Sequence, residues 1–467
     1  MPFSLVSYGR DLSKVFSPHA MAKCGTIRKK LQTFRTSWPK NTHFSESGNL
    51  YIPFKGENSD GHKYVEDSLK KGASAALWQS DVPNPPTHLP ILIVDNCLVA
   101  LQELAREYRK QLQVKVVGIT GSNGKTTTKD MTASLLSTAY KVQKTEGNYN
   151  NHIGLPLTVL GLDEDTDIAV LEMGMSGRGE IEFLTKLASP DAVVITNIGE
   201  SHLLDLGSRE GIAEAKLEIL QGLKDGGLAV LHGDEPLLME RINKYKGNVR
   251  VQTFGRSDTN NFFPIDIIQL EQGNMFKIKE TDENFELPVL GTHNILNAIA
   301  AIIIAHYFDV PFNKMNEGLA NVKLTNMRME LVEGFHGEKI INDAYNASPT
   351  SMMAAIELVS NLKGYKKIIL VLGDMLELGP QEEQYHQQIG EGLNPEKIDY
   401  VFTYGKLAEH IAEGARSALG KNRVFSFMEK RELIKVLEQH VNNDSLVLVK
   451  ASRGMRLEEI VTALQKK

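Results

Sequence analysis

The sequence predicts an α/β protein with three domains. At 467 residues the chain is too long for one hydrophobic core. From about residue 113, strand-like apolar runs alternate with helical stretches, and the alternation restarts after about residue 326; this is typical of parallel sheets covered by helices. A glycine-containing loop between a strand and a helix, at 121–125, indicates a phosphate-binding site. We expect domains over residues 1–95, 96–326 and 327–467.

Apolar runs and spacing predict the elements in order. The first domain has expected strands at 50–54, 75–78 and 91–94 and a helix at 65–71. A helix at 98–111 leads to the central domain, whose expected strands are 114–120, 168–173, 192–197 and 228–232. The segment 251–290 is more β-like, and a helix then runs from about 291 to 308.

The last domain repeats the alternation of strands and helices. Its expected strands are 339–342, 366–372, 400–404 and 445–450. Ser348 and Pro349 are a good helix start, with serine as cap and proline in the first position. We therefore expect a doubly wound domain, with ligands at the carboxyl ends of its strands.

Composition excludes several function classes. The formal net charge is −6, so no basic surface indicates nucleic acid binding. Cys24 and Cys97 are too few for a disulfide framework or a zinc site, which suits a reducing cytoplasm. The amino terminus lacks a signal-peptide pattern, and the longest apolar run, 298–305, is far short of the ~20 residues that span a bilayer. We expect a cytoplasmic protein without membrane insertion.

A candidate phosphate loop follows the strand at 114–120. It is a T-G-x-x-G-K-T variant in which Ile119 stands where the usual pattern has glycine; its residues are Gly121, Ser122, Asn123, Gly124, Lys125, Thr126 and Thr127. Free backbone N–H groups and the positive end of the next helix would bind phosphate. Lys125 would reach β- and γ-phosphate oxygens, and the Thr126 hydroxyl would bind Mg²⁺. The alternative is a plain turn with a surface lysine.

Two candidate metal ligands follow strand ends. Glu172 closes the strand at 168–173 and could reach the Mg²⁺ held by Thr126. His202 follows the strand at 192–197, where a neutral imidazole could ligate a second divalent ion. The alternatives are a solvent-facing glutamate and a loop histidine that is satisfied by hydrogen bonds.

Two further features permit more than one interpretation. Lys216 lies in a helical stretch, and its chemistry alone favours a solvated surface lysine. The loop 147–156 contains Asn148, Asn150 and Asn151, whose amides suit sugar, phosphate or peptide groups. The same loop could be an amide-rich turn without a ligand.

Together these motifs resemble those of the Mur ligases. The phosphate loop, the loop 147–156 and the segments 171–175, 197–202 and 342–349 occur in the family's order and spacing, and the resemblance covers essentially the whole chain. It implies a UDP-binding first domain, a central ATP-binding domain and a C-terminal Rossmann-like domain for the incoming dipeptide. The match is closest to the Gram-positive member that adds D-alanyl-D-alanine to UDP-N-acetylmuramoyl-tripeptide. The Asp-Asn-Pro-Arg motif of diaminopimelate-adding relatives is not found, which supports that choice.

The resemblance also assigns roles to single residues. It implies that Thr126 and Glu172 hold one Mg²⁺ and that His202 helps to hold a second. Lys216 matches a lysine that family members carry as a carbamate, which favours a catalytic role for it beside Lys125 and His202. The positions that match nucleotide-contacting residues are His293, Asn294, Arg328 and Asp343. The positions in the stretch that distinguishes this ligase from its relatives are Tyr345 and Asn346.

In the first domain, the segments 48–56 and 60–62 match the family's uridine-binding pattern. The substrate-contacting positions implied are Thr42, Lys55, Asp60, Gly61 and His62. Residues 41–43 read Asn-Thr-His where the family usually has Asp-Ser-Arg, so the hydroxyl is kept and the arginine charge is lost. In the last domain, the segments 373–379 and 450–455 match family segments that face the active cleft, and Ala451 replaces a usual glycine in the second, which adds a methyl group where the backbone needs room.

The implied reaction forms an amide in a peptidoglycan precursor. ATP with two Mg²⁺ would convert the tripeptide carboxylate into an acyl phosphate, and the amine of D-alanyl-D-alanine would displace the phosphate. We expect a monomer. A folate polyglutamylating ligase shares the loop and the acyl-phosphate chemistry but would not need the uridine pattern. A non-catalytic protein that changes conformation on binding nucleotide is the other alternative.

Overall fold

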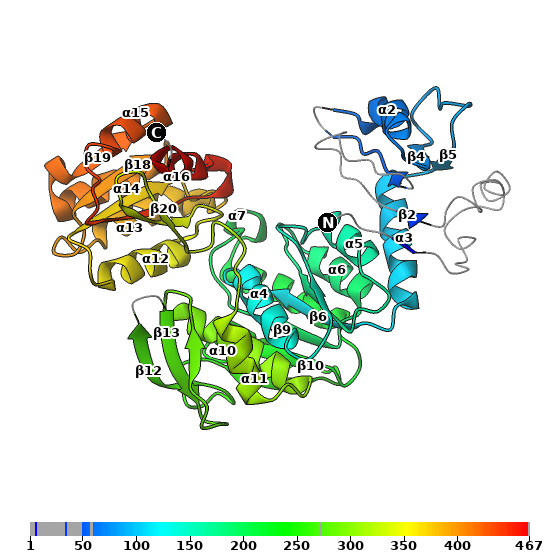
Figure 1. The fold of residues 1–467 in the computed structure, drawn as a ribbon, viewed down its shortest axis with the longest axis horizontal. Coiled ribbons are helices and arrows are strands. Elements are labelled where there is room, and N and C mark those ends of the chain that lie inside the picture. Colours follow the sequence, from blue (N-terminus) through cyan, green and yellow to red (C-terminus); the bar gives the residue numbers. More distant parts are fainter. Residues whose placement is uncertain (1–4, 7–32, 35–48, 57–58, 271–272, 466–467) are drawn as a thin grey trace.

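The computed structural model describes residues 5–6, 33–34, 49–56, 59–270 and 273–465. Three α/β bodies follow one another along the chain (Figure 1). The long helix α3 (Cys97–Gln111) joins the first body, in blue, to the middle body, in cyan and green. The last body, in yellow to red, lies on the opposite side of the middle body. This arrangement agrees with the predicted α/β class.

The first body contains a parallel sheet in the order β3-β4-β5. Its elements are β3 (Leu50–Tyr51), η3 (Gly61–Tyr64), α2 (Val65–Lys70), β4 (Ala75–Gln79) and β5 (Ile91–Val94). The strand expected at 50–54 stops early, because Pro53 has no N–H to donate to a ladder. A separate antiparallel pair joins β1 (Leu5–Val6) to β2 (Thr33–Phe34).

The middle body is built on a six-stranded parallel sheet in the order β11-β10-β9-β6-β8-β7. Its strands are β6 (Lys115–Thr120), β7 (Val142–Lys144), β8 (Ile168–Glu172), β9 (Ala192–Ile195), β10 (Leu228–His232) and β11 (Arg250–Phe254). Its helices are α4 (Lys125–Leu136), α5 (Gly154–Leu160), α6 (Glu180–Ala188), α7 (Leu203–Leu206), α8 (Arg209–Leu217), η4 (Glu218–Gln221), α9 (Pro236–Ile242), α10 (His293–Tyr307) and α11 (Phe312–Ala320).

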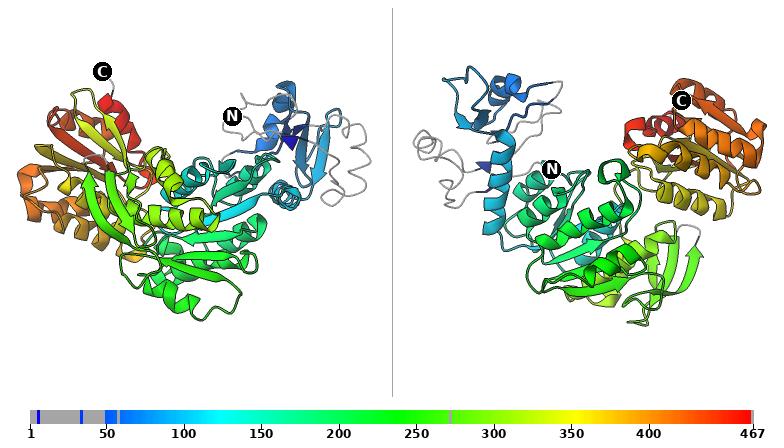
Figure 2. Two further views of the ribbon diagram at one scale, coloured as in Figure 1. Left: turned by 60° about the horizontal axis from the view of Figure 1, so that its bottom comes forward. Right: turned by 180° about the vertical axis from the view of Figure 1, so that it is seen from behind.

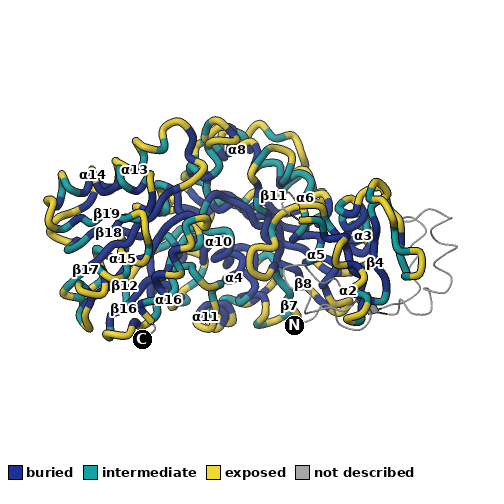
Figure 3. The backbone as a smooth tube through the Cα atoms, turned by 90° about the horizontal axis from the view of Figure 1, so that it is seen from above, coloured by how far each residue is buried: buried dark blue, intermediate teal, exposed yellow. Residues whose placement is uncertain are grey.

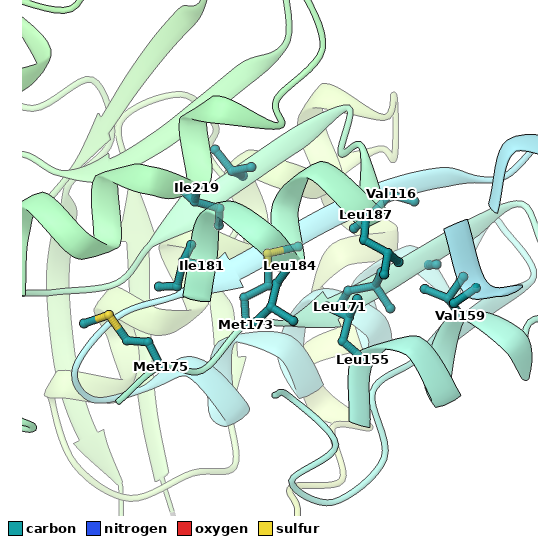
Figure 4. Close-up of a cluster of buried hydrophobic side chains, with 14 of the residues drawn as sticks. Val116, Leu155, Val159, Leu171, Met173, Met175, Ile181, Leu184, Leu187 and Ile219 are labelled. Atoms are coloured by element: carbon teal, nitrogen blue, oxygen red, sulfur yellow. The ribbon is translucent and has the colours of Figure 1, made fainter. Parts of the chain in front are cut away.

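Both faces of this sheet are covered. Val116 and Leu171 point to one face, where they pack with residues of α5 and α6 (Figure 4). Their neighbours Val117 and Val170 point to the other face and pack with residues of α4 and α10. Because both faces are buried, the strands are continuous apolar runs, as the sequence predicted.

A small antiparallel sheet extends the middle body (Figure 2). Its strands are β12 (Pro264–Leu270), β13 (Gly273–Ile278) and β14 (Phe285–Leu287). The β-like pattern predicted for 251–290 is therefore confirmed.

The last body is a doubly wound sheet in the order β15-β16-β20-β17-β18-β19, with β15 antiparallel and the other strands parallel. Its strands are β15 (Glu330–Glu333), β16 (Lys339–Asp343), β17 (Lys367–Gly373), β18 (Tyr400–Tyr404), β19 (Val424–Phe427) and β20 (Ser445–Lys450). Its helices are α12 (Pro349–Asn361), η5 (Gly379–Gln381), α13 (Glu382–Glu391), α14 (Ala408–Leu419), η6 (Lys421–Arg423), α15 (Lys430–Leu437), η7 (Arg453–Met455) and α16 (Glu458–Gln465). Ser348 caps α12 and Pro349 opens it, as predicted.

Burial follows this layered design. Figure 3 shows buried backbone, in dark blue, along the strands of the two large sheets. Ile341 and Leu370 belong to one core cluster of the last body, and their neighbours Ile340 and Val371 belong to the cluster on the opposite face. Over the part of the chain that is described, no helix is long and apolar enough to cross a membrane.

Candidate active site

The phosphate loop lies between β6 and the amino end of α4, and its neighbours fix its shape. Asn197, which follows β9, accepts a hydrogen bond from Ser122 N at its backbone oxygen (3.1 Å) and one from Asn123 N at its side chain (2.9 Å). Gly124 has a left-handed backbone with φ of 80°, and a Cβ there would lie 2.6 Å from Oδ1 of Asn297. Only glycine fits this position without strain.

Lys125 is the cation of this loop. Its Nζ donates to the backbone oxygens of Gly121 (2.7 Å) and Ser122 (3.2 Å). Desolvation lowers the pKa of Lys125 to about 8, with Glu172 raising it and the Arg328 charge lowering it further. A bound phosphate would favour the protonated form. The Lys125 amine would therefore become fully protonated when an anion binds beside it.

Glu172, at the carboxyl end of β8, is 1% exposed. Its Oε1 accepts a hydrogen bond from Asn150 Nδ2 at 2.7 Å, while its Oε2 is buried without a hydrogen-bond partner among the described residues. A buried carboxylate oxygen without a donor is costly unless a cation meets it. The geometry therefore fits a divalent cation at Glu172, next to the phosphate loop.

His202 and Lys216 come from α7 and α8 of the same body. His202 caps α7 with a left-handed backbone, and its Nδ1 lies 2.8 Å from Oε2 of Glu377. Lys216 is 2% exposed and forms no ion pair within the described residues. Burial, followed by the nearby Lys125 charge, lowers the pKa of Lys216 well below its usual range. A neutral amine is the form that reacts with carbon dioxide to give a carbamate.

The C-terminal body contributes two cations. The Arg328 guanidinium stacks 4.0 Å over the Tyr345 ring and donates to Oγ1 of Thr126 at 3.1 Å. Lys450, at the end of β20, forms a buried ion pair with Asp343. These contacts place positive charge from the last body beside the phosphate loop of the middle body.

The amino end of α10 closes the site on a third side. Burial lowers the pKa of His293, which favours its neutral form. Asn294 donates to Leu290 O at 2.7 Å and accepts from Asn297 Nδ2 at 2.9 Å. Asn297 in turn accepts from Thr128 Oγ1 at 3.3 Å, so α10 is tied to the phosphate-loop helix α4.

One cavity of about 610 Å³ brings most of the predicted residues together. The predicted residues that line it are Ser122, Asn123, Gly124, Lys125, Thr127, Asn150, Asn151, Glu172, His202, Lys216, His293, Asn294, Arg328, Asp343, Tyr345 and Asn346. Gly121 and Thr126 do not line it, but they bond to Lys125 and Arg328, which do. Asn148 does not line it either, but it lies beside Tyr345, which does.

The predicted uridine-binding residues do not line this cavity. Asp60 accepts from the backbone N of His62 (3.0 Å) and lies 2.6 Å from its Nδ1. The Nε2 of His62 accepts from Gln79 N at 3.2 Å, and Lys55 pairs with Asp81 at 2.9 Å. A Cβ on Gly61 would lie 2.9 Å from Phe54 N, so this turn requires glycine. Thr42 lies outside the described residues.

Among the lining residues to which the sequence assigned no role, four polar ones take part in the contacts of the site: Asn197, Asn297, Glu377 and Lys450. Asn197 and Lys450 follow or end parallel strands, so the rule that ligands gather at carboxyl ends could have found them. Asn297 faces the phosphate loop from one turn inside α10, and Glu377 depends on how two bodies meet. No sequence pattern signals Asn297, whereas Glu377 lies in the segment 373–379, which the resemblance matches to a segment facing the cleft.

Few protein groups are available as metal ligands. Over residues 49–56, 59–270 and 273–465, no three His, Cys, Asp or Glu side chains come together as a metal site. Mg²⁺ in phosphate-transfer sites is typically bound by one or two carboxylates together with substrate phosphates. Glu172 and the Thr126 hydroxyl fit that pattern.

Comparisons with known proteins now decide the family. The description Mur ligase middle domain matches residues 119–305, and Mur ligase, glutamate ligase domain, matches 327–453. The UDP-N-acetylmuramoyl-tripeptide–D-alanyl-D-alanine ligase of Bacillus subtilis is 53% identical over 424 residues, covering 91% of this chain and 92% of that protein. The chain belongs to the Mur ligase family. The ligase of the same name from Escherichia coli is 35% identical, covering 90% of this Mur ligase and 91% of its relative.

Solved structures agree with the family and the fold. MurF from Acinetobacter baumannii is 29% identical with a TM-score of 0.82, and covers 93% of this Mur ligase and 94% of the other chain. MurF from Thermotoga maritima in complex with ADP is 30% identical with a TM-score of 0.79, covering 91% and 96%. The predicted resemblance and the three-part α/β fold are confirmed. Folylpolyglutamate synthase from Mycobacterium tuberculosis, at 18% identity and a TM-score of 0.64, shares the fold.

Proposed function

We propose that this Mur ligase uses ATP to join D-alanyl-D-alanine to UDP-N-acetylmuramoyl-tripeptide, releasing ADP and phosphate and forming a peptidoglycan precursor. The observation that carries the proposal is the single cavity that unites the phosphate loop, the unpartnered Oε2 of Glu172, the buried Lys216 and cations of the last body. The names of its relatives and the ADP-bound MurF structure support the same substrates and nucleotide.

The residues have distinct tasks in this reaction. Lys125 and Arg328 stabilise negative charge on the transferred phosphoryl group. Thr126, Glu172, His202 and a carbamate on Lys216 would hold two Mg²⁺, which when bound neutralise phosphate charge. The tripeptide carboxylate attacks the γ-phosphoryl, the amine then attacks the acyl phosphate, and phosphate leaves. The protein supplies no nucleophile, so catalysis depends on positioning.

We assign the uridine end of the substrate to residues 1–95, ATP to residues 96–326 and the incoming dipeptide to residues 327–467. In this scheme His293, Asn294 and Asp343 contact the nucleoside of ATP. Asn148, Asn150, Asn151, Tyr345 and Asn346 contact the tripeptide or the dipeptide. We also propose that the protein acts in the cytoplasm as a monomer.

A coupled phosphate-release assay tests the function. The assay crosses lysine- and diaminopimelate-containing tripeptides with several D,D-dipeptides, and a folate with glutamate serves as the competing substrate pair. We expect release only when a UDP-muramoyl-tripeptide and D-alanyl-D-alanine are both present, and its loss in Lys125→Ala. Release with the folate pair, or slow release that ignores the dipeptide, would contradict the proposal.

A further inference from the structure

The middle and last bodies touch next to His202. The backbone N of Leu204, in α7, donates to the backbone oxygen of Glu377 at 3.1 Å. At the same junction, Nδ1 of His202 lies at ion-pair distance, 2.8 Å, from Oε2 of Glu377, but it forms no aligned hydrogen bond within the described residues. Gly379, which begins η5, packs against Leu204. A main-chain and a side-chain contact thus join one loop of each body.

Both partners of the side-chain contact have an uncommon backbone. His202 and Glu377 each have φ of 66°, in the left-handed region that non-glycine residues rarely adopt. Such conformations persist where surrounding structure holds them, and they concentrate at functional sites. Glu377 also lines the cavity, although its side chain is 54% exposed. The Glu377 carboxylate thus lies within reach of the imidazole, while about half of its side chain stays exposed to solvent.

We propose that Glu377 is a positioning residue, which fixes the His202 ring and makes its cation site depend on docking of the C-terminal body. In this proposal a small rotation lets Nδ1–H donate to the Glu377 carboxylate, a bond that the 2.8 Å contact does not yet make, and the lone pair of Nε2 is then free for a metal ion. Metal-binding histidines are commonly held in this way by a carboxylate. The inference rests on the proposed function, because it assumes a divalent cation beside His202. It adds that the last body completes the cation site of the middle body.

The first test reads the His202 tautomer and needs no turnover. Nitrogen-15 spectra of the full chain at pH 8, with the His202 signal assigned by its loss in His202→Ala, should show the Nδ1–H tautomer. Glu377→Ala should shift His202 toward the Nε2–H tautomer, and Glu377→Gln, which keeps an acceptor oxygen, should restore it. An identical tautomer in wild type and Glu377→Ala would overturn the proposal.

Thr350→Val is the matched control for loss of a contact between bodies. Thr350 Oγ1 donates across the same cleft to Glu200 Oε2 at 2.7 Å and does not touch His202. We expect this variant to keep the wild-type His202 tautomer. A tautomer shift as large as that of Glu377→Ala would show that any loosening of the two bodies suffices, and would overturn the specific role of Glu377.

The second test is a double-mutant cycle on the Mg²⁺ dependence of phosphate release. Glu377→Ala should raise the half-maximal Mg²⁺ concentration by about tenfold, as for other groups that orient metal ligands. In a His202→Ala background the same change should have no further effect, because the group it positions is gone. Equal effects in both backgrounds would overturn the proposal. If the enzyme did not turn over these substrates, the tautomer test would still decide the role of Glu377.

Discussion

Asn150 is expected to orient the Glu172 carboxylate, which we propose binds the cation, so Asn150→Ala should raise the Mg²⁺ concentration needed for half-maximal activity. The bond from Asn150 Nδ2 to Glu172 Oε1 measures 2.7 Å and leaves the buried Oε2 free. The amide therefore orients the carboxylate without competing for the oxygen that would meet the cation. Hydrogen bonds to charged groups contribute about 1.5–3 kcal/mol. At about 1.4 kcal/mol per factor of ten, the expected rise in half-maximal Mg²⁺ concentration is roughly 10- to 100-fold.

The assay is phosphate release at saturating substrates over a Mg²⁺ titration. Asn151→Ala is the control from the same loop. Asn151 Oδ1 accepts from Ile153 N (3.1 Å) and Gly154 N (2.8 Å) at the start of α5, so its loss should cost about 1 kcal/mol of stability and lower the Tm. It should leave the Mg²⁺ midpoint in place. An unchanged midpoint in Asn150→Ala would refute the orienting role.

Three other predictions follow from the site. ATP binding near pH 8 should be accompanied by proton uptake, because Lys125, with a pKa of about 8, is partly neutral until the bound phosphate raises that pKa. Calorimetry in buffers of different ionisation enthalpy measures this uptake, which should disappear in Lys125→Ala. Carbon-13 bicarbonate should give a carbamate NMR signal that Lys216→Arg lacks, and a signal retained in that variant would place the carbamate elsewhere. Gly124→Ala should lower nucleotide affinity more than tenfold in equilibrium titrations. A left-handed backbone costs alanine about 1–2 kcal/mol, and the added Cβ would meet Asn297. A variant with wild-type affinity would contradict this prediction.

In the two large sheets, the sequence predicted the buried strands better than the edge strands. The strands expected at 228–232, 400–404 and 445–450 have those bounds in the structure, because both faces of these strands are covered and their sequences are continuous apolar runs. The strands β7, β15 and β19 were missed. All three lie at sheet edges, where fewer contacts are made and the apolar pattern is weak.

The positions of the site residues could be predicted where the order of strands in the sheet alone brings them together. Glu172 and the phosphate loop follow adjacent parallel strands, so their meeting follows from the βα pattern. Residue chemistry alone made Lys216 a surface lysine, which was wrong, because Ile212, Ala213 and Ala215 bury that helix. The resemblance placed the segment 373–379 at the cleft, but the contact of Glu377 with His202 lies beyond this reasoning, since it depends on how two separately folded bodies dock.

Oxygen-18 transfer is the most direct test of the central claim, that the cavity converts a carboxylate into an acyl phosphate. UDP-muramoyl-tripeptide labelled in its terminal carboxylate is incubated with ATP, Mg²⁺ and D-alanyl-D-alanine, and the released phosphate is analysed by mass spectrometry. The account predicts one carboxylate oxygen in each phosphate released. Phosphate free of the label during productive amide formation would contradict it.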